Sequence, residues 1–155
     1  MNIILYDQPM IFEPTQKAEL IETDPASKTI LIVDDDSTAV DFFEMLLLRR
    51  GFKTATAKSG KSALGRLSRD SARKMDLLLL DLMMPGESGY EIIKKLQEPE
   101  YQAVPICVIT ARELDRGMVD MIKSEPNVRD YFLKPVNSAQ LTSKIHQILG
   151  TQPAQ

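Results

Sequence analysis

The sequence lacks several features that mark particular classes of protein. It has one cysteine, Cys107, in 155 residues, so no internal disulfide can form, as is usual in a reducing cytoplasm. No apolar run approaches the about 20 residues of a membrane span, and the run at residues 3–5 is too short for the core of a signal peptide. With 22 acidic and 19 basic residues, the net charge of −3 offers no basic field to nucleic acid. These absences predict a cytoplasmic protein that neither enters a membrane nor binds nucleic acid directly.

The first 28 residues differ in composition from the rest of the chain. Three prolines, Pro9, Pro14 and Pro25, interrupt a polar background around two small apolar patches at residues 3–6 and 10–12. We interpret residues 1–28 as an N-terminal extension or linker, whose apolar patches are available to dock on the domain or on a partner. Residues 29–150 are then the folded domain, and residues 151–155 are a C-terminal tail.

From Thr29 onward, short apolar runs typical of strands alternate with helical patterns. Strands are predicted at residues 29–33, 52–57, 77–80, 105–109 and 131–133. Helices are predicted between Ser37 or Thr38 and Gly51, at 59–69, at 89–97, from Leu114 to Pro126, and around Leu141 to Leu149. On the last helix we expect His146, the only histidine, to face solvent as a surface residue and not to carry phosphoryl groups. Strict alternation of this kind predicts a doubly wound, five-stranded parallel sheet with five helices.

Polar residues follow four of the predicted strands. The first strand ends in Asp34, Asp35 and Asp36, the third in Asp81, the fourth in Thr110, and the fifth in Lys134. Ligands collect at the carboxyl edge of such a sheet. If these strands are neighbours, several carboxylates, a hydroxyl and an ammonium group meet at one edge and form a reaction site.

The residue types suggest the chemistry of this site. Crowded carboxylates repel one another unless a hard cation or a lysine offsets their charge, and Mg²⁺ suits a few carboxylates together with phosphate oxygens. A neighbouring accessible carboxylate can attack phosphorus and hold the group as an acyl phosphate, and Asp81 is the best placed nucleophile. Lys134 would neutralise phosphoryl oxygens, and the Thr110 hydroxyl would donate a hydrogen bond to the same group.

Four motifs, in order VDDD, LLLLDLMMPGESG, VITA and YFLKP, closely resemble the receiver domain of bacterial two-component response regulators. The resemblance covers residues 29 to about 149. It implies a flavodoxin-like fold with strand order 2-1-3-4-5.

The resemblance also implies a function. A partner histidine kinase or phosphotransfer protein, or a small phosphodonor, would phosphorylate Asp81. Mg²⁺ would be held by Asp35, Asp81 and the backbone carbonyl of Met83, with Asp34 assisting through water. Thr110 and Tyr131 would act as the switch pair.

The implied output is a change of surface. On phosphorylation, Thr110 and Tyr131 would move and remodel the face of the fourth helix, fifth strand and fifth helix. That face would contact a downstream protein target, and family members often form a homodimer through it. The domain would turn over no substrate other than its own phosphoryl label, which it would hydrolyse slowly.

One departure from the family pattern lies before the fifth strand. Asn127-Val128 stands where the family usually has Gly-Ala. Asparagine tolerates left-handed backbone geometry almost as well as glycine, which would preserve the turn. A second ambiguity is which two of the three consecutive aspartates serve the metal; we favour Asp34 and Asp35, and interpret Asp36 mainly as a helix cap.

Two other functions fit parts of the pattern. The run from Asp34 to Thr38 also fits the DxDxT start of haloacid-dehalogenase-like phosphatases, with Asp34 as nucleophile and Asp36 as acid/base. That alternative leaves Asp81 idle and lacks a late acidic pair for Mg²⁺. A phosphate-independent protein-binding receiver module is the other alternative, although every side chain needed for phosphorylation is present.

Overall fold

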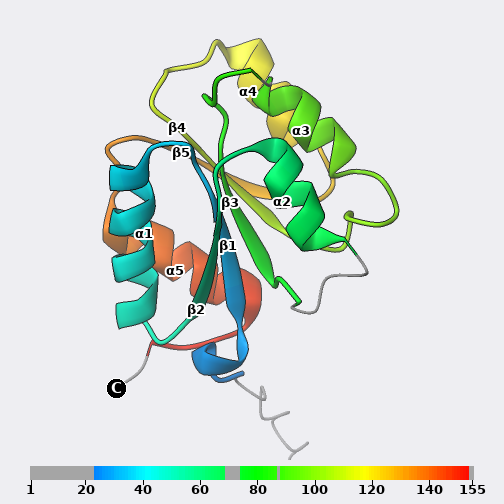
Figure 1. Cartoon of the computed structure of the whole chain (residues 1–155). Coiled ribbons are helices and arrows are strands. Elements are labelled where there is room, and N and C mark those ends of the chain that lie inside the picture. The colour runs from blue at the N-terminus through cyan, green and yellow to red at the C-terminus, as the bar shows by residue number, and fades with distance from the viewer. Residues whose placement is uncertain (1–22, 69–73, 87, 154–155) are drawn as a thin grey trace, which may run out of the picture.

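The computed structural model describes residues 23–68, 74–86 and 88–153. Their centre is a parallel five-stranded sheet with strand order β2-β1-β3-β4-β5 (Figure 1). The strands are β1 Thr29–Val33, β2 Lys53–Ala57, β3 Leu77–Asp81, β4 Ile106–Thr110 and β5 Val128–Leu133. This arrangement confirms the predicted flavodoxin-like fold.

Five α-helices cover the two faces of the sheet (Figure 1). They are α1 Ser37–Arg49, α2 Gly60–Leu67, α3 Gly89–Lys95, α4 Arg116–Lys123 and α5 Ser138–Leu149, and a short 3-10 helix, η1 Pro25–Ser27, precedes β1. The buried side chains of α1 and α5 join one hydrophobic core, and those of α2, α3 and α4 join the other. The predicted second helix extended to Arg69, which lies outside the described residues.

The four leucines before Asp81 show why the sequence of the central strand has no polar alternation. Leu77 and Leu79 point into the core beneath α1 and α5, and Leu78 and Leu80 point into the opposite core. All four are at most 2% exposed. A central parallel strand has no solvent face, so every position is apolar until the strand ends.

Local signals set both ends of α1. The Asp36 carboxylate accepts a hydrogen bond from the Thr38 N–H at 2.9 Å, so the predicted helix cap is confirmed. At the other end Gly51 has a φ of 88°, a conformation that glycine adopts without steric cost. The helix therefore starts directly after the aspartates that follow β1.

The last strand is longer than predicted. β5 begins at Val128, whereas residues 131–133 were expected. It lies at the edge of the sheet, and its early residues Arg129 and Asp130 are polar and reach solvent, which hides the strand pattern. Similarly, α4 begins at Arg116 after an Asp115 cap, so Leu114 lies before the helix.

The turn before β5 forms without the left-handed geometry that asparagine tolerates. Among the described residues only glycines have a positive φ. The buried Asn127 side chain instead donates to the Leu96 carbonyl at 2.9 Å and accepts a hydrogen bond from Gln97 at 2.6 Å. Its amide therefore joins the end of α3 to the start of β5, a contact that glycine could not make.

The prediction that His146 is a surface residue was also wrong, because its side chain is only 6% exposed. The chain after α5 turns back, and the Thr151 hydroxyl lies 2.8 Å from His146 Nδ1. Phe52 packs against the imidazole with a centroid distance of 4.9 Å. Thr151 also pairs with Thr23, whose N–H donates to the Gly150 carbonyl at 3.0 Å. The two ends of the described chain therefore meet beside the end of α5.

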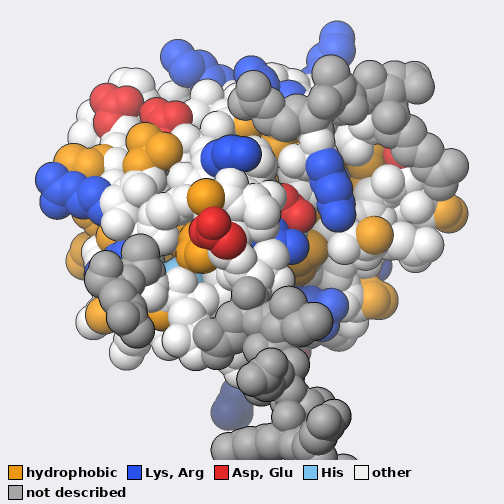
Figure 2. Space-filling model, turned by 90° about the horizontal axis from the view of Figure 1, so that it is seen from below, with side chains coloured by type: hydrophobic (Ala, Val, Ile, Leu, Met, Phe, Trp, Pro, Cys, Tyr) orange, Lys and Arg blue, Asp and Glu red, His pale blue; other side chains and the backbone are white. Residues whose placement is uncertain are grey.

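The described helices include none that is both long enough and apolar enough to cross a bilayer. Figure 2 shows the domain from the end where the chain enters β1. Lysine and arginine side chains on this face lie scattered among uncharged ones and do not gather into one continuous patch.

Candidate phosphoacceptor site

The sheet brings the ends of β1 and β3 together. These strands are parallel neighbours, with Val33 paired to Leu80, so the next residues, Asp34 and Asp81, lie side by side. One carboxylate oxygen from each of Asp34, Asp35 and Asp81 lies within 4.8 Å of the others. Asp34 and Asp81 are buried and Asp35 is exposed, so solvent reaches the cluster on the side of Asp35.

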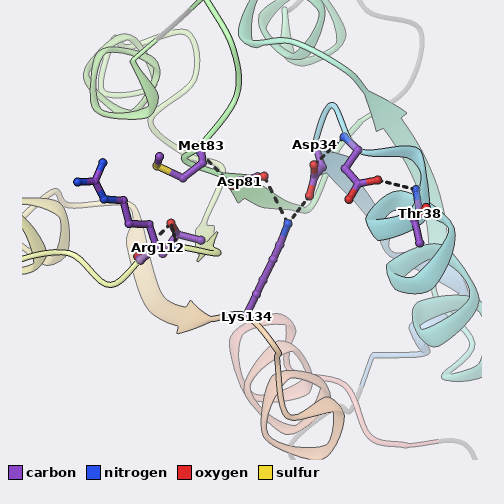
Figure 3. A network of polar contacts seen from close by, with 8 residues as sticks. Asp34, Thr38, Asp81, Met83, Arg112 and Lys134 are labelled. Atoms are coloured by element: carbon purple, nitrogen blue, oxygen red, sulfur yellow. Dashed lines mark hydrogen bonds and ion pairs between the residues drawn. The ribbon is translucent and has the colours of Figure 1, made fainter.

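Lys134 follows β5 and reaches across the end of the sheet to this cluster (Figure 3). Its ammonium nitrogen lies 2.8 Å from Asp34 Oδ2 and 3.4 Å from Asp81 Oδ2. The aliphatic part spans the position of β4, because β5 is two strands away from β3. One cation therefore bridges carboxylates that are 47 positions apart in the sequence.

Backbone N–H groups hold the other oxygen of each buried carboxylate. Asp34 Oδ1 accepts from the Asp36 N–H at 2.9 Å, and Asp81 Oδ1 accepts from the Met83 N–H at 2.9 Å. The Oδ2 atom of each residue is the one that faces Lys134. The turns after the two strands thus fix the orientation of both carboxylates.

The electrostatics of the cluster favour an incoming cation. Burial raises the pKa of Asp81 above its ordinary value, and the charge of Asp34 raises it further, while the Met83 N–H and Lys134 oppose the rise. Burial lowers the pKa of Lys134, but its contacts with Asp34 and Asp81 outweigh burial and leave that pKa above the ordinary value. Lysine 134 stays protonated, and its single positive charge does not balance three carboxylates.

The donor set fits a hard divalent cation. Three carboxylates that offer oxygens within 4.8 Å of one another, with one side open to water, match the oxygen ligands and retained waters that Mg²⁺ prefers. Asp34, Asp35 and Asp81 are the residues that would hold it. Met83 lies two residues beyond Asp81, and the role of its backbone carbonyl as a ligand stays a prediction.

The two predicted switch residues lie on β4 and β5, Thr110 at the end of its strand and Tyr131 within its strand. Thr110 is fully buried, and its hydroxyl is engaged by the backbone of Arg112, accepting from the N–H at 3.2 Å and lying 3.3 Å from the carbonyl (Figure 3). Tyr131 is half-buried and packs against the core beneath α2, α3 and α4. In the described residues, no hydrogen bond links Thr110 or Tyr131 to the carboxylates.

Two contacts that hold site residues in place were not predicted, and the backbone makes both. These are the Met83 N–H on Asp81 and the Arg112 backbone on Thr110. The Met-Pro-Gly turn gave a weak signal for the first, because a carboxylate often accepts from an N–H two residues later in a turn. Nothing in the sequence indicated Arg112.

The sequence is similar to a known domain family and to several curated proteins. Residues 30–146 match the model of the response regulator receiver domain family. The sensory transduction protein RegX3 of Mycolicibacterium smegmatis is 34% identical over 121 residues, which cover 78% of this chain and 50% of that protein. The transcriptional regulatory protein CpxR of Escherichia coli K12 is 38% identical over 122 residues, covering 77% of this chain and 48% of that protein. The chain spans about half the length of these curated relatives.

Solved structures agree with the sequence matches. A putative response regulator from Chloroflexus aurantiacus superposes with a TM-score of 0.68 at 31% identity, covering 79% of this chain and 97% of that one. A response regulator receiver protein from Pseudomonas putida gives a TM-score of 0.69 at 26% identity, covering 77% and 96%. The fold of the domain is therefore shared with these proteins.

Proposed function

The chain belongs to the response regulator receiver domain family, and from that premise we propose that it is a phosphoacceptor in a two-component phosphorelay, modified on Asp81. The observation that carries this proposal is the position of Asp81. Its carboxylate lies within reach of Asp34, Asp35 and the Lys134 ammonium, all at one edge of the sheet. That combination supplies a nucleophile, a cation site and a fixed positive charge.

In the proposed reaction, an Asp81 oxygen attacks the phosphorus of a phosphohistidine. The new P–O bond gives an acyl phosphate while the P–N bond breaks, and the departing imidazole takes up a proton. Mg²⁺, when bound by Asp34, Asp35 and Asp81, would neutralise charge on the transferring group. The Met83 N–H holds Asp81 Oδ1 in place, which orients the carboxylate before the phosphodonor arrives.

Lys134 neutralises the phosphoryl oxygens in this mechanism. Its nitrogen already lies 3.4 Å from Asp81 Oδ2, so the phosphoryl group would be added beside it. Before modification, the same ammonium group reduces the repulsion between Asp34 and Asp81. Lys134 therefore has an electrostatic role both before and after Asp81 is phosphorylated.

The proposed switch starts at Thr110. Its hydroxyl exchanges the Arg112 backbone for a phosphoryl oxygen, which pulls the loop after β4 toward Asp81. The half-buried Tyr131 on the neighbouring strand then moves inward. These movements remodel the face formed by α4, β5 and α5, where a downstream protein or a second copy of the chain would bind.

The proposed phosphodonors are a sensor histidine kinase or a phosphotransfer protein, and small phosphodonors as well. Slow hydrolysis of the acyl phosphate would end the signal. The phosphatase alternative gives Asp36 a catalytic role, but its carboxylate caps α1 through the Thr38 N–H, and Asp81 rather than Asp36 shares Lys134 with Asp34. The receiver mechanism uses every member of the cluster.

Intact-mass measurement tests this proposal. The protein is incubated with Mg²⁺ and acetyl phosphate or phosphoramidate, and Asp81→Asn and Asp76→Asn are treated in the same way. We expect the wild type and Asp76→Asn to gain one labile phosphoryl group and Asp81→Asn to gain none. Labelling of a folded Asp81→Asn protein would refute the role of Asp81, and catalytic release of phosphate that depends on Asp34 would establish the phosphatase. A folded wild type without label would indicate the phosphate-independent module.

A further inference from the structure

Helix α1 has large apolar side chains on its solvent side. Phe42, Met45 and Leu48 are 40%, 48% and 55% exposed, and they recur every three residues, so they form one stripe along the helix, here called the α1 stripe. The opposite side of α1 is already filled by buried Val40 and Phe43 among others. A surface helix normally has polar residues opposite its core face, so the α1 stripe is unusual for a face left in water.

The chain enters the described structure next to the end of this helix. Thr23 is held by the hydrogen bond from its N–H to the Gly150 carbonyl. Pro25 lies against Gly51, where an added Cβ would be 3.5 Å from the proline Cβ, and Gly51 follows the last turn of α1. Figure 1 shows η1 near the lower end of α1. Residues 1–22 therefore join the domain close to Leu48, the near end of the α1 stripe.

The length of chain before Thr23 is ample to reach the stripe. Residues 10–12 precede Thr23 by 11 to 13 positions, and such a segment spans up to about 35–45 Å when extended. The distance along the helix from Phe42 to Leu48 is only about 9 Å. The connecting residues can therefore turn and still place residues 10–12 over the stripe.

Residue types along the segment complement those along α1. Counting back from Thr23, Glu22 and Glu19 flank the apolar pair Leu20-Ile21. Helix α1 ends at Arg49, which Arg50 follows, and neither arginine forms an ion pair within the described part of the chain. Further along the segment, residues 10–12 are Met-Ile-Phe, opposite the apolar stripe. With Asp7 and Glu13 against Lys17, residues 1–22 carry four acidic side chains and one basic one, a net side-chain charge of −3.

We infer that the α1 stripe is the docking surface for the chain's own N-terminal segment, with the apolar residues 10–12 on Met45 and its neighbours and the acidic residues near Arg49 and Arg50. Burial of three large side chains supplies the driving force, and the tether raises the effective concentration of the segment into the millimolar range. This contact does not require phosphorylation of Asp81. It makes α1 a surface that any partner must compete for.

Photo-crosslinking in the full-length chain tests the inference. p-Benzoylphenylalanine replaces Phe42 in one protein and Met121, an α4 residue with a similar exposure of 47%, in a control. We expect irradiation to join position 42 to residues 1–22 within a single chain, with a yield that does not change on dilution. Position 121 should give no such product.

A second substitution separates docking from chance encounters of a tethered segment. In the Phe42-labelled protein, Met45→Asp places a charge in the contact and should lower the intramolecular yield about tenfold or more, the effect of about 1.4 kcal/mol. Met121→Asp should leave the yield unchanged. Crosslinks only to a second copy, no crosslink to residues 1–22, or equal yields in Met45→Asp and Met121→Asp would each overturn the inference, provided circular dichroism shows the fold.

Discussion

Two clusters of carboxylates and lysines lie at opposite edges of the same sheet. At the carboxyl edge, Asp34, Asp35 and Asp81 share Lys134. At the amino edge, Asp76 immediately precedes β3 and lies 3.8 Å from Lys28 and 3.9 Å from Lys74, and its Oδ2 accepts the Thr29 N–H at 2.9 Å. Both clusters join the β1 and β3 ends of the sheet with the same residue types.

The difference between the clusters is the balance of charge. The carboxyl-edge cluster has three carboxylates for one ammonium group, and burial with Asp34 raises the pKa of Asp81. The amino-edge cluster has one carboxylate for two ammonium groups, and its backbone hydrogen bond is satisfied. The surplus negative charge at the carboxyl edge favours binding of a cation. At the amino edge, the charge and the hydrogen-bonding capacity of Asp76 are already matched by protein groups, so that carboxylate only stabilises the fold.

The largest expected contrast concerns the two lysines. Lys134→Ala should slow phosphorylation of Asp81 by acetyl phosphate about 10- to 100-fold, because a charge-assisted hydrogen bond to the phosphoryl group is lost. Lys28→Ala, the matched change at the amino edge, should leave the rate unchanged. Rates come from intact mass against time at saturating Mg²⁺. Equal rates for both variants would show that Lys134 is only structural.

Substitution of Asp34 and of Asp36 should have different effects on the affinity for Mg²⁺. Asp34→Asn removes one carboxylate of the cluster and should weaken Mg²⁺ binding about tenfold, as measured by isothermal titration calorimetry. Asp36→Asn should change affinity little, because asparagine also caps helices and Asp36 does not belong to the three-carboxylate cluster. A larger loss in Asp36→Asn would mean that the metal uses a different pair of the three aspartates.

Removal of one carboxylate should have opposite effects on stability at the two edges. Asp76→Ala leaves the Thr29 N–H without its acceptor and should cost about 1–2 kcal/mol. Asp81→Asn without Mg²⁺ should raise the melting temperature by about 2–4 °C near pH 7, since it relieves a buried, repelled charge.

The Asp81→Asn gain has a definite pH dependence. The folded pKa of Asp81 is raised, so ionisation costs the native state stability above that pKa, and the cost vanishes once the pH falls below the ordinary value of 3.8. The stability advantage of Asp81→Asn should therefore shrink in acid, as followed by thermal unfolding in a chelating buffer. An advantage that grows in acid would contradict the raised pKa.

The smallest effect should come from His146, which lies outside both clusters. Burial, assisted by the charge of Arg50, lowers the pKa of His146 below its ordinary 6.5. Protonation therefore favours the unfolded chain, and the stability present above pH 6.5 is lost as the pH falls through the folded pKa. His146→Gln should reduce the fall in melting temperature between pH 7.5 and 5.5 by about 1–2 °C. An unchanged fall in melting temperature would mean that a group other than His146 takes up the proton.

Much of the site was predictable because its residues follow strands directly. The run of four leucines marks a buried central strand, and Asp81 stands at its end, so its exposure to the ligand edge follows from sequence alone. The β5 boundary and the environment of His146 were not predictable in the same way. Polar residues on an edge strand resemble a loop in sequence. The burial of His146 depends on contacts with Thr151 and Phe52, which lie outside α5 and cannot be predicted from the periodicity of the helix.

By itself the sequence determined the alternation of strands and helices, the capping of α1 by Asp36, and the identity of the residues at each strand end. These depend on interactions between near neighbours in the chain. Only the tertiary structure decided that one Lys134 ammonium bridges Asp34 and Asp81, that Thr110 is held by the Arg112 backbone, and that the ends of the described chain meet at Thr23 and Thr151. The physical reason is that strand order and the turns beyond each strand set these distances, and no local pattern specifies them.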